Sequence, residues 1–202
     1  VNPINLYGAT KLASDKLFLS ANAYAGGKET VLSVVRYGNV AGSRGSVIPF
    51  FSMLRDRGEK VLPITDNRMT RFWITLDEAV DLVFKAIDES KGGETYISKI
   101  PSFKVTDVAK AIHPDAELEE VGIREGEKLH EVMVTQYDSF HTYEYKDHYI
   151  IYPNFDWWNE EAHLTQGGKK VTEFFRYSSD LNEEWLDVDG IRERLKEIEI
   201  VY

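Results

Sequence analysis

The sequence predicts an α/β protein: the end of a helix-covered parallel sheet, followed by a smaller α+β region. Helix and strand signals alternate through the first half of the 202 residues. Residues 31–35 form a short, apolar, β-branched run, which is typical of a strand buried on both faces of a parallel sheet. The second half has shorter elements and a candidate β-hairpin over 141–152, so the regular alternation ends near residue 100.

The individual elements follow from apolar periodicity and from the residues that end helices. In the first half we expect a helix over 7–24 that ends at Gly26 and Gly27, the strand over 31–35, a helix over 48–57, a strand over 61–65, a helix from 76 and a strand over 95–100. In the second half we expect a helix over 105–112, a strand over 118–123, the hairpin, an irregular stretch over 153–170 and a helix over 188–199. Thr75 and Glu78 have the spacing of a capping box, and a broad apolar face follows them.

Composition excludes several classes of protein. With 43% hydrophobic and 12% aromatic residues, the chain is not disordered throughout. The 24 basic and 34 acidic residues leave a net charge of −10, so the basic surface of a nucleic-acid-binding protein is missing. The chain has no cysteine, no histidine pair with metal-binding spacing and no apolar run that could span a bilayer. We therefore expect no metal, nucleic acid or membrane partner, and a cytoplasmic location.

The first candidate site is the pair Tyr7 and Lys11, because residues four apart share one face of a helix. A nearby ammonium stabilises a phenolate. Tyr7 could therefore act as the general base that takes a proton from an alcohol during hydride transfer. The alternative is chance, since a tyrosine and a lysine at this spacing occur on many surface helices.

The second candidate site is the stretch from Arg36 to Pro49, which follows the expected strand directly. In open α/β sheets, ligands bind beyond the carboxyl ends of the strands. The glycines of this stretch let backbone approach a ligand closely, Asn39 offers a donor and an acceptor, and Arg44 offers a forked cation. An ordinary strand-to-helix loop is the alternative interpretation.

Two further arginines are candidates for binding an anion in this acidic chain. Arg71 lies in the segment 69–75 and Arg124 in the segment 122–128, each beside an expected strand. Guanidinium groups at such places could bind an anionic substrate, such as a diphosphate, through paired hydrogen bonds. A surface salt bridge is the alternative for either arginine.

In this order the motifs resemble the extended short-chain dehydrogenase/reductase superfamily and, within it, the family of inverting UDP-N-acetylglucosamine 4,6-dehydratases. The resemblance rests on residues 2–12, 36–49, 69–75, 125–133 and 177–186, and it covers nearly the whole chain. It implies an NADP-binding Rossmann-type fold of which residues 1–202 are the C-terminal portion, with 101–202 mostly substrate region and tail. The chain contains no G-x-G-x-x-G, so the family's Gly-rich half is expected to precede Val1.

The resemblance implies a role for each matching residue. Tyr7 and Lys11 match the catalytic pair, which also contacts the nicotinamide ribose, and Val40 matches a cofactor-binding position. The residues that match the substrate site are Asn39, Arg44, Gly45, Ser46, Val47, Ile48, Thr65, Arg71 and Arg124. One departure is Glu125, which stands where the family usually has proline.

The reaction implied by the resemblance removes water from UDP-N-acetylglucosamine and inverts C5. The product would be UDP-2-acetamido-2,6-dideoxy-β-L-arabino-hex-4-ulose, used for pseudaminic acid and for glycans of flagellin and other surface structures. A homo-oligomer is expected, because the family tends to form hexamers. Two alternatives stay open: a related UDP-sugar epimerase of polysaccharide synthesis, and a substrate-domain fragment that is inactive as given.

Overall fold

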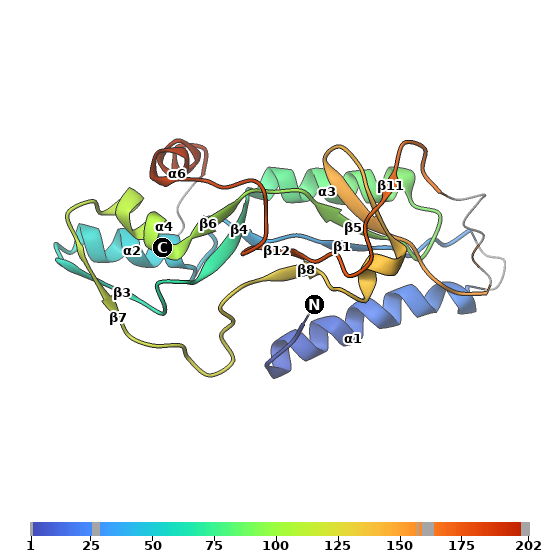
Figure 1. The fold of residues 1–202 in the computed structure, drawn as a ribbon, viewed down its shortest axis with the longest axis horizontal. Helices are drawn as coiled ribbons and strands as arrows, with labels where there is room; N and C mark the ends of the chain where they lie inside the picture. The colour runs from blue at the N-terminus through green and yellow to red at the C-terminus, as the bar shows by residue number, and fades with distance from the viewer. Residues whose placement is uncertain (1, 26–28, 157, 159–163, 199–202) are drawn as a thin grey trace. The chain divides into compact units, whose positions relative to one another are not determined.

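The computed structural model describes residues 2–25, 29–156, 158 and 164–198, and it contains two compact units. Unit 1 consists of the segments 1–37, 77–99 and 132–177. Unit 2 consists of the segments 38–76, 100–131 and 178–202. Each unit therefore combines early, middle and late parts of the chain (Figure 1), and the division does not fall at a single point such as residue 101.

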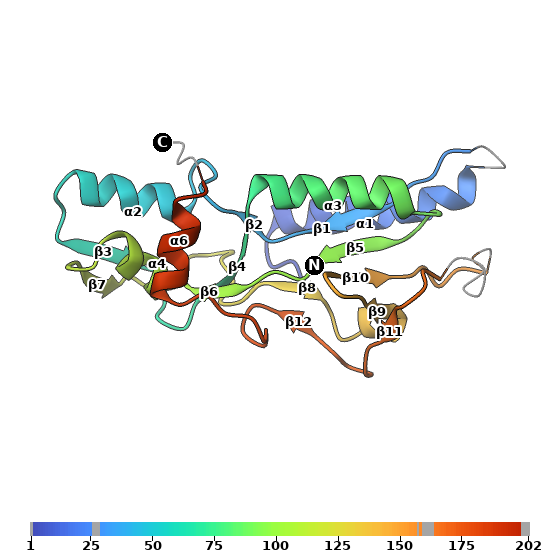
Figure 2. The same cartoon turned by 90° about the horizontal axis from the view of Figure 1, so that it is seen from above.

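Unit 1 is built on a five-stranded sheet with the strand order β1-β5-β10-β9-β11. The strands are β1 (Val34–Arg36), β5 (Thr95–Ser98), β10 (His148–Ile151), β9 (Thr142–Glu144) and β11 (Lys169–Lys170). β1 and β5 are parallel, whereas every later pair is antiparallel. α1 (Leu6–Ala21) and α3 (Leu76–Glu89) lie on opposite sides of this sheet (Figures 1 and 2).

Shorter elements complete unit 1. They are η1 (Asn22–Tyr24), β8 (Val132–Val134), η2 (Asp138–His141) and β12 (Tyr177–Ser178), at which the chain passes into unit 2. The apolar core of unit 1 joins Leu82 and Ala86 of α3 to Tyr96, Ile150 and Tyr152. Leu82 and Ala86 therefore lie on the side of α3 that faces the sheet, and the apolar periodicity of the helix predicts that side to be apolar.

Unit 2 packs three helices against short pairs of strands (Figure 2). The helices are α2 (Val47–Asp56), α4 (Val105–Ile112) and α6 (Val188–Leu195). The strands are β2 (Asn39–Val40), β3 (Val61–Ile64), β4 (Thr70–Ile74), β6 (Ser102–Lys104) and β7 (Glu117–Glu120). β2 is parallel to β4, β3 is parallel to β7, and β4 is antiparallel to β6. The core of the unit includes Phe51, Trp73, Val108 and Ile191.

Most expected elements are confirmed, with their bounds shifted by a few residues. These are the helices over 7–24, 48–57, from 76, over 105–112 and from 188, the strands over 61–65 and 95–100, and the hairpin, which is β9 and β10. The last helix ends at Leu195 rather than at 199. Gly26 and Gly27, which we expected to end the first helix, lie outside the described residues.

Two strand predictions need correction. The strand expected over 31–35 begins only at Val34 and is half-buried rather than buried on both faces. Within the described part of the chain β1 is paired along one edge only, with β5, so its other side lacks the neighbour that would bury it. The strand expected over 118–123 ends at Glu120, because Gly122 adopts a φ of 89° and turns the backbone out of the sheet.

The apolar face expected on α3 is divided between core and surface. Ala79, Leu82 and Ala86 are buried, whereas Val80 and Ile87 are 40% and 67% exposed. No helix in the described ranges is long and apolar enough to cross a membrane.

Candidate functional site

Tyr7 and Lys11 lie in the first two turns of α1, in unit 1. Asn5 caps the helix, because its side-chain oxygen accepts a 2.7 Å hydrogen bond from the backbone N–H of Gly8. The Lys11 ammonium lies 5.4 Å from the centre of the Tyr7 ring, which is within the range of a cation–π interaction. Tyr7 is 72% exposed. The two side chains therefore share one helix face, as predicted, and present a hydroxyl and an ammonium at the surface of unit 1.

Asn39 and Val40 form the short strand β2, in unit 2. The pairing of β2 with β4 requires a glycine before it, because a Cβ on Gly38 would lie 2.7 Å from the Cβ of Phe72. Asn39 is exposed and Val40 is half-buried, so the amide is the more accessible of the two side chains. Gly38 therefore allows a close approach to Phe72 of the protein itself, and the predicted approach of this stretch to a ligand stays a prediction.

The turn from β2 into α2 contains five of the residues expected to bind substrate. Arg44 and Gly45 are exposed, and Gly45 adopts a φ of 76° that favours glycine. Ser46 is the N-cap residue, with extended backbone, and its buried Oγ has no hydrogen-bond partner among the described residues. Val47 is half-buried. This end of α2 therefore combines a cation, a hydroxyl and the N–H groups of a first helical turn.

Ile48 differs from the other residues of this turn in its burial. Its side chain is only 3% exposed and belongs to the apolar core of unit 2. The second position of α2 faces inward, so the Ile48 side chain packs in the core, and its expected place beside the substrate stays a prediction.

Thr65 and Arg124 both lie beyond the ends of two paired strands in unit 2. Thr65 directly follows β3, and Arg124 lies in the loop after β7. Because β3 and β7 are parallel, with Ile64 opposite Glu120, their carboxyl ends lie at the same edge. The Thr65 hydroxyl is 3.4 Å from an Oε1 atom of Glu127, which ties this edge to the loop.

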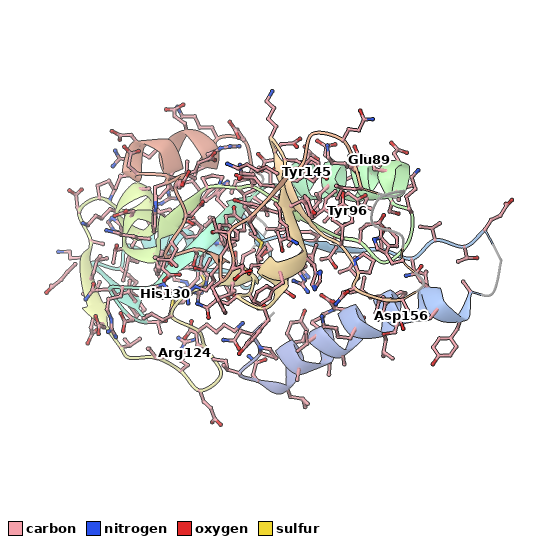
Figure 3. All side chains as sticks on the ribbon, turned by 45° about the vertical axis from the view of Figure 1, so that its right-hand side comes forward. Glu89, Tyr96, Arg124, His130, Tyr145 and Asp156 are labelled. Carbon is pink, nitrogen blue, oxygen red and sulfur yellow. The ribbon has the colours of Figure 1, made fainter. Side chains whose placement is uncertain are left out.

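Arg124, labelled in Figure 3, is exposed on that loop. It forms no ion pair with any of the described residues. A turn holds it in place, since the backbone N–H of Glu127 donates a 3.1 Å hydrogen bond to the Arg124 carbonyl. An exposed guanidinium at a strand-end loop can bind an external anion.

Arg71, in contrast, binds the backbone of its own chain. Its Nη1 donates to the carbonyls of Thr70 and Leu129 at 2.7 and 3.1 Å, and its Nη2 donates to that of Lys128 at 2.8 Å. Its Nε faces Glu131 at 3.8 Å. Burial lowers the pKa of the Arg71 guanidinium, and two glutamates, Glu131 first, oppose this shift. The donors of Arg71 therefore hold the segment that follows the Arg124 loop, and the expected contact of Arg71 with a substrate stays a prediction.

A buried hydroxyl network around Thr70 was not predicted. Thr70 Oγ1 lies 2.8 Å from His130 Nδ1 and 2.7 Å from Ser179 Oγ, and the backbone N–H of Glu131 donates to Ser179 Oγ. His130, labelled in Figure 3, lies outside any helix. Both hydroxyl residues are buried, so the network joins segments rather than exposing a nucleophile. No local pattern reveals it, since 109 residues separate Thr70 from Ser179.

The expected site residues therefore divide between the two units. Tyr7 and Lys11 belong to unit 1, and Val40 and the residues expected to bind substrate belong to unit 2. Within the described ranges, no three His, Asp or Glu side chains gather into a group that could hold a metal ion.

Comparison with known proteins gives one family and several relatives. The family described as polysaccharide biosynthesis protein matches residues 1–153. The UDP-N-acetylglucosamine 4,6-dehydratase (inverting) of Campylobacter jejuni is 52% identical over 189 residues, which are 91% of this chain and 57% of the relative. The UDP-glucose 4-epimerase of Rickettsia conorii is 35% identical over 205 residues, which are 100% of this chain and 60% of the relative.

Among solved structures, the X-ray structure of Pen from Bacillus thuringiensis is similar to this chain with a TM-score of 0.82 and 32% identity. The match covers 100% of this chain and 60% of that one. It confirms the predicted α/β fold class. The chain spans somewhat over half the length of the curated relatives that it matches.

Proposed function

The chain belongs to the polysaccharide biosynthesis protein family, and from this membership we propose that the whole protein is an inverting UDP-N-acetylglucosamine 4,6-dehydratase. The observation that carries the proposal is the 52% identity, over 91% of the chain, with a relative of that name. The exposed pair of Tyr7 and Lys11 on α1 supports it, because this chemistry needs a proton acceptor beside a sugar hydroxyl.

We further propose that the cofactor is NADP. The residues present fit its nicotinamide end, because Tyr7 and Lys11 expose a hydroxyl and an ammonium that would bind ribose hydroxyls. When bound, this cofactor would supply the hydride chemistry, accepting a hydride from C4 of the sugar and returning one at C6. Val40, at the end of β2, is the further residue that we propose for cofactor binding, from the resemblance of its motif.

In the proposed reaction, Tyr7 takes the proton of the C4 hydroxyl as C4 is oxidised. Lys11 holds Tyr7 and polarises its hydroxyl. The C4 ketone acidifies the proton on C5. Loss of that proton and of the C6 hydroxyl as water would give an unsaturated ketone. Protonation of C5 from the opposite face would then give the inverted product. A side chain that moves the C5 proton is not among the candidates found in this chain.

The N-terminus of α2 and the Arg124 loop are the proposed binding sites for the UDP-sugar. Arg44, Ser46 and the first N–H groups of α2 would bind anionic or hydroxyl oxygens. Asn39 offers an exposed amide at the start of β2, and Thr65 follows β3 at the edge where the Arg124 loop follows β7. Arg124 would bind the diphosphate, since it has no ion-pair partner among the described residues.

The second candidate function is a UDP-sugar epimerase, which the 35% identity with the Rickettsia enzyme over the full chain favours. Both enzymes would oxidise C4, but only the dehydratase removes the C6 oxygen. We propose the dehydratase because the identity with it is higher over nearly the same part of the chain.

A homo-oligomer, a cytoplasmic location and a role in pseudaminic acid and flagellin glycosylation stay predictions.

The test is the product that the whole protein makes from UDP-N-acetylglucosamine with NADP, followed by proton NMR. A new methyl signal from C6, together with a C4 ketone and an L-arabino configuration at C5, is the expected result. Conversion to the C4 epimer with C6 still hydroxylated would support the epimerase instead. The 202-residue chain by itself serves as a control and is expected to be inactive.

A further inference from the structure

The helix that carries Tyr7 and Lys11 is attached to unit 1 by polar contacts rather than by buried apolar side chains: an ion pair along its length, and two hydrogen bonds between its C-cap residue Asn22 and the backbone of Leu32. No residue of α1 is buried. Arg36, at the end of β1, donates from Nε to Oδ2 of Asp15 on α1 at 2.8 Å. Both side chains are only 9% exposed, so this contact is shielded from water far more than an ordinary surface pair.

Arg36 also binds two other segments of unit 1. Its Nη1 donates to the carbonyl of Met133 on β8 at 3.1 Å and to Oδ2 of Asp138 on η2 at 3.2 Å. Asp138 in turn accepts a 3.1 Å hydrogen bond from the backbone N–H of Thr135. One guanidinium therefore fixes α1 against the end of β1, against β8 and against the start of η2.

The position of Asp15 along α1 links this attachment to the catalytic pair. Tyr7, Lys11 and Asp15 follow one another at intervals of four residues. Each interval advances the direction of the side chain by only about 40°, because a helix has about 3.6 residues per turn. The three side chains thus form one stripe, and a contact that fixes Asp15 also fixes the rotation of α1 about its axis.

The pair has the character of an orienting contact. Burying two charges is unfavourable unless their geometry is good, and apolar side chains can hold a helix to a sheet equally well. Moreover, the second carboxylate oxygen of Asp15 is buried and has no hydrogen-bond partner among the described residues. The ion pair of Arg36 and Asp15 instead fixes the orientation of α1, because a planar guanidinium binds a carboxylate at a defined angle.

We propose that Arg36 is a positioning residue, which acts through Asp15 to orient α1 and thereby the Tyr7 hydroxyl and the Lys11 ammonium. Arg36 lies in the stretch that sequence analysis selected for ligand binding, yet its hydrogen bonds are made inside unit 1. The inference rests on the proposed function, since it concerns the residues that carry the redox step.

The test uses the whole protein with Asp15→Asn, Arg36→Lys and the two changes combined. Each single change is expected to lower kcat for dehydration at least tenfold and to leave KM for UDP-N-acetylglucosamine within threefold, because the proposed substrate residues lie in unit 2. The double variant is expected to lose no more than about twofold beyond Asp15→Asn, because residues that act through one contact are not additive. A matched control is Arg55→Lys with Asp56→Asn, an exposed pair at 2.8 Å whose change is expected to leave kcat unchanged.

A second readout is amide hydrogen exchange of α1, which needs no turnover. Exchange in peptides from residues 6–21 is expected to accelerate in Asp15→Asn, while peptides from α4 stay protected. The proposal is overturned if kcat stays within twofold of wild type, if the two losses multiply in the double variant, or if α1 exchanges as in wild type. Should Asp15→Asn fail to fold, Arg36→Lys decides by the same kcat and KM comparison, because lysine keeps the charge. A wild-type protein that makes no 4-keto-6-deoxy product would refute the proposed function, and the exchange result would still test the positioning.

Discussion

Arg71 donates a 2.8 Å hydrogen bond to the carbonyl oxygen of Lys128, a residue 57 positions further along the chain. It binds the carbonyl of Leu129 as well, so one buried side chain fastens the segment that follows the Arg124 loop. Arg71 and Arg124 look equivalent in the sequence, since each is an arginine beside a strand in an acidic chain. In the structure the first maintains the fold of the loop and the second is left exposed on it.

This difference predicts opposite effects on stability. Arg71→Met is expected to lower the free energy of unfolding by about 3 kcal/mol, because it leaves buried carbonyls without their charged donor. Arg124→Met is the matched control and is expected to change that free energy by less than about 0.5 kcal/mol, as exposed substitutions usually do. Urea denaturation of the two variants of the whole protein measures both values. Equal losses would contradict the separation of roles.

The same two arginines should differ in kinetics. Arg124→Ala is expected to raise KM for the UDP-sugar about tenfold, because the loss of one hydrogen bond to a charged group weakens binding by about that factor. Its kcat is expected to stay within twofold, because the diphosphate carries the same charge before and during hydride transfer, so this binding is uniform. Steady-state kinetics with saturating cofactor measure both constants. A large fall in kcat with KM unchanged would remove Arg124 from the diphosphate site.

Tyr7→Phe is expected to lower kcat by about 10²–10⁴-fold, the usual contribution of a general acid–base group. The fold should be retained, because Tyr7 is 72% exposed and phenylalanine keeps the aromatic ring, so that only the hydroxyl is lost. Tyr24→Phe is the matched control: Tyr24 is 89% exposed, close to the end of the same helix, and its loss of a hydroxyl should leave kcat unchanged. Turnover of Tyr7→Phe within twofold of wild type would exclude Tyr7 from the chemistry.

Local patterns were sufficient to predict much of the fold and one part of the site. The helices follow from periodicity, and Tyr7 and Lys11 share a face because four residues make about one turn. The short strands β2, β4 and β6 could not be predicted in this way, because two to five residues carry little pattern and their pairing depends on distant partners. The hydrogen bonds of Arg71 could not be predicted for the same reason, since its acceptors at Lys128 and Leu129 are remote in sequence.

The hairpin of unit 1 contains a histidine that should make stability depend on pH. The His148 ring stacks on Tyr145 at 4.8 Å and on Tyr96 at 6.2 Å, and its Nδ1 lies 2.6 Å from Asp147 (Figure 3 labels both tyrosines). Burial lowers the pKa of His148 below its ordinary 6.5, and the positive charge of Lys85 lowers it further. The hydrogen bond to Asp147 opposes this shift.

Because the folded pKa of His148 lies below the unfolded one, acid favours unfolding. Below about pH 6.5 the unfolded chain binds a proton that the folded chain does not, so the free energy of unfolding decreases as the pH falls toward the folded pKa. His148→Phe keeps the stacked ring and is expected to reduce the drop in thermal midpoint between pH 7.5 and 5.5. An equal drop in His148→Phe and wild type would contradict the assignment.

The most direct test of the proposed function follows one hydrogen atom through the reaction. The whole protein is incubated with NADP and UDP-N-acetylglucosamine that carries deuterium at C4, and the product is analysed by proton and deuterium NMR. The dehydratase predicts that the deuterium leaves C4 and appears in the C6 methyl group, while C5 takes its proton from the solvent. Deuterium that returns to C4, in a sugar whose C6 still carries its hydroxyl, would contradict the dehydratase and identify an epimerase.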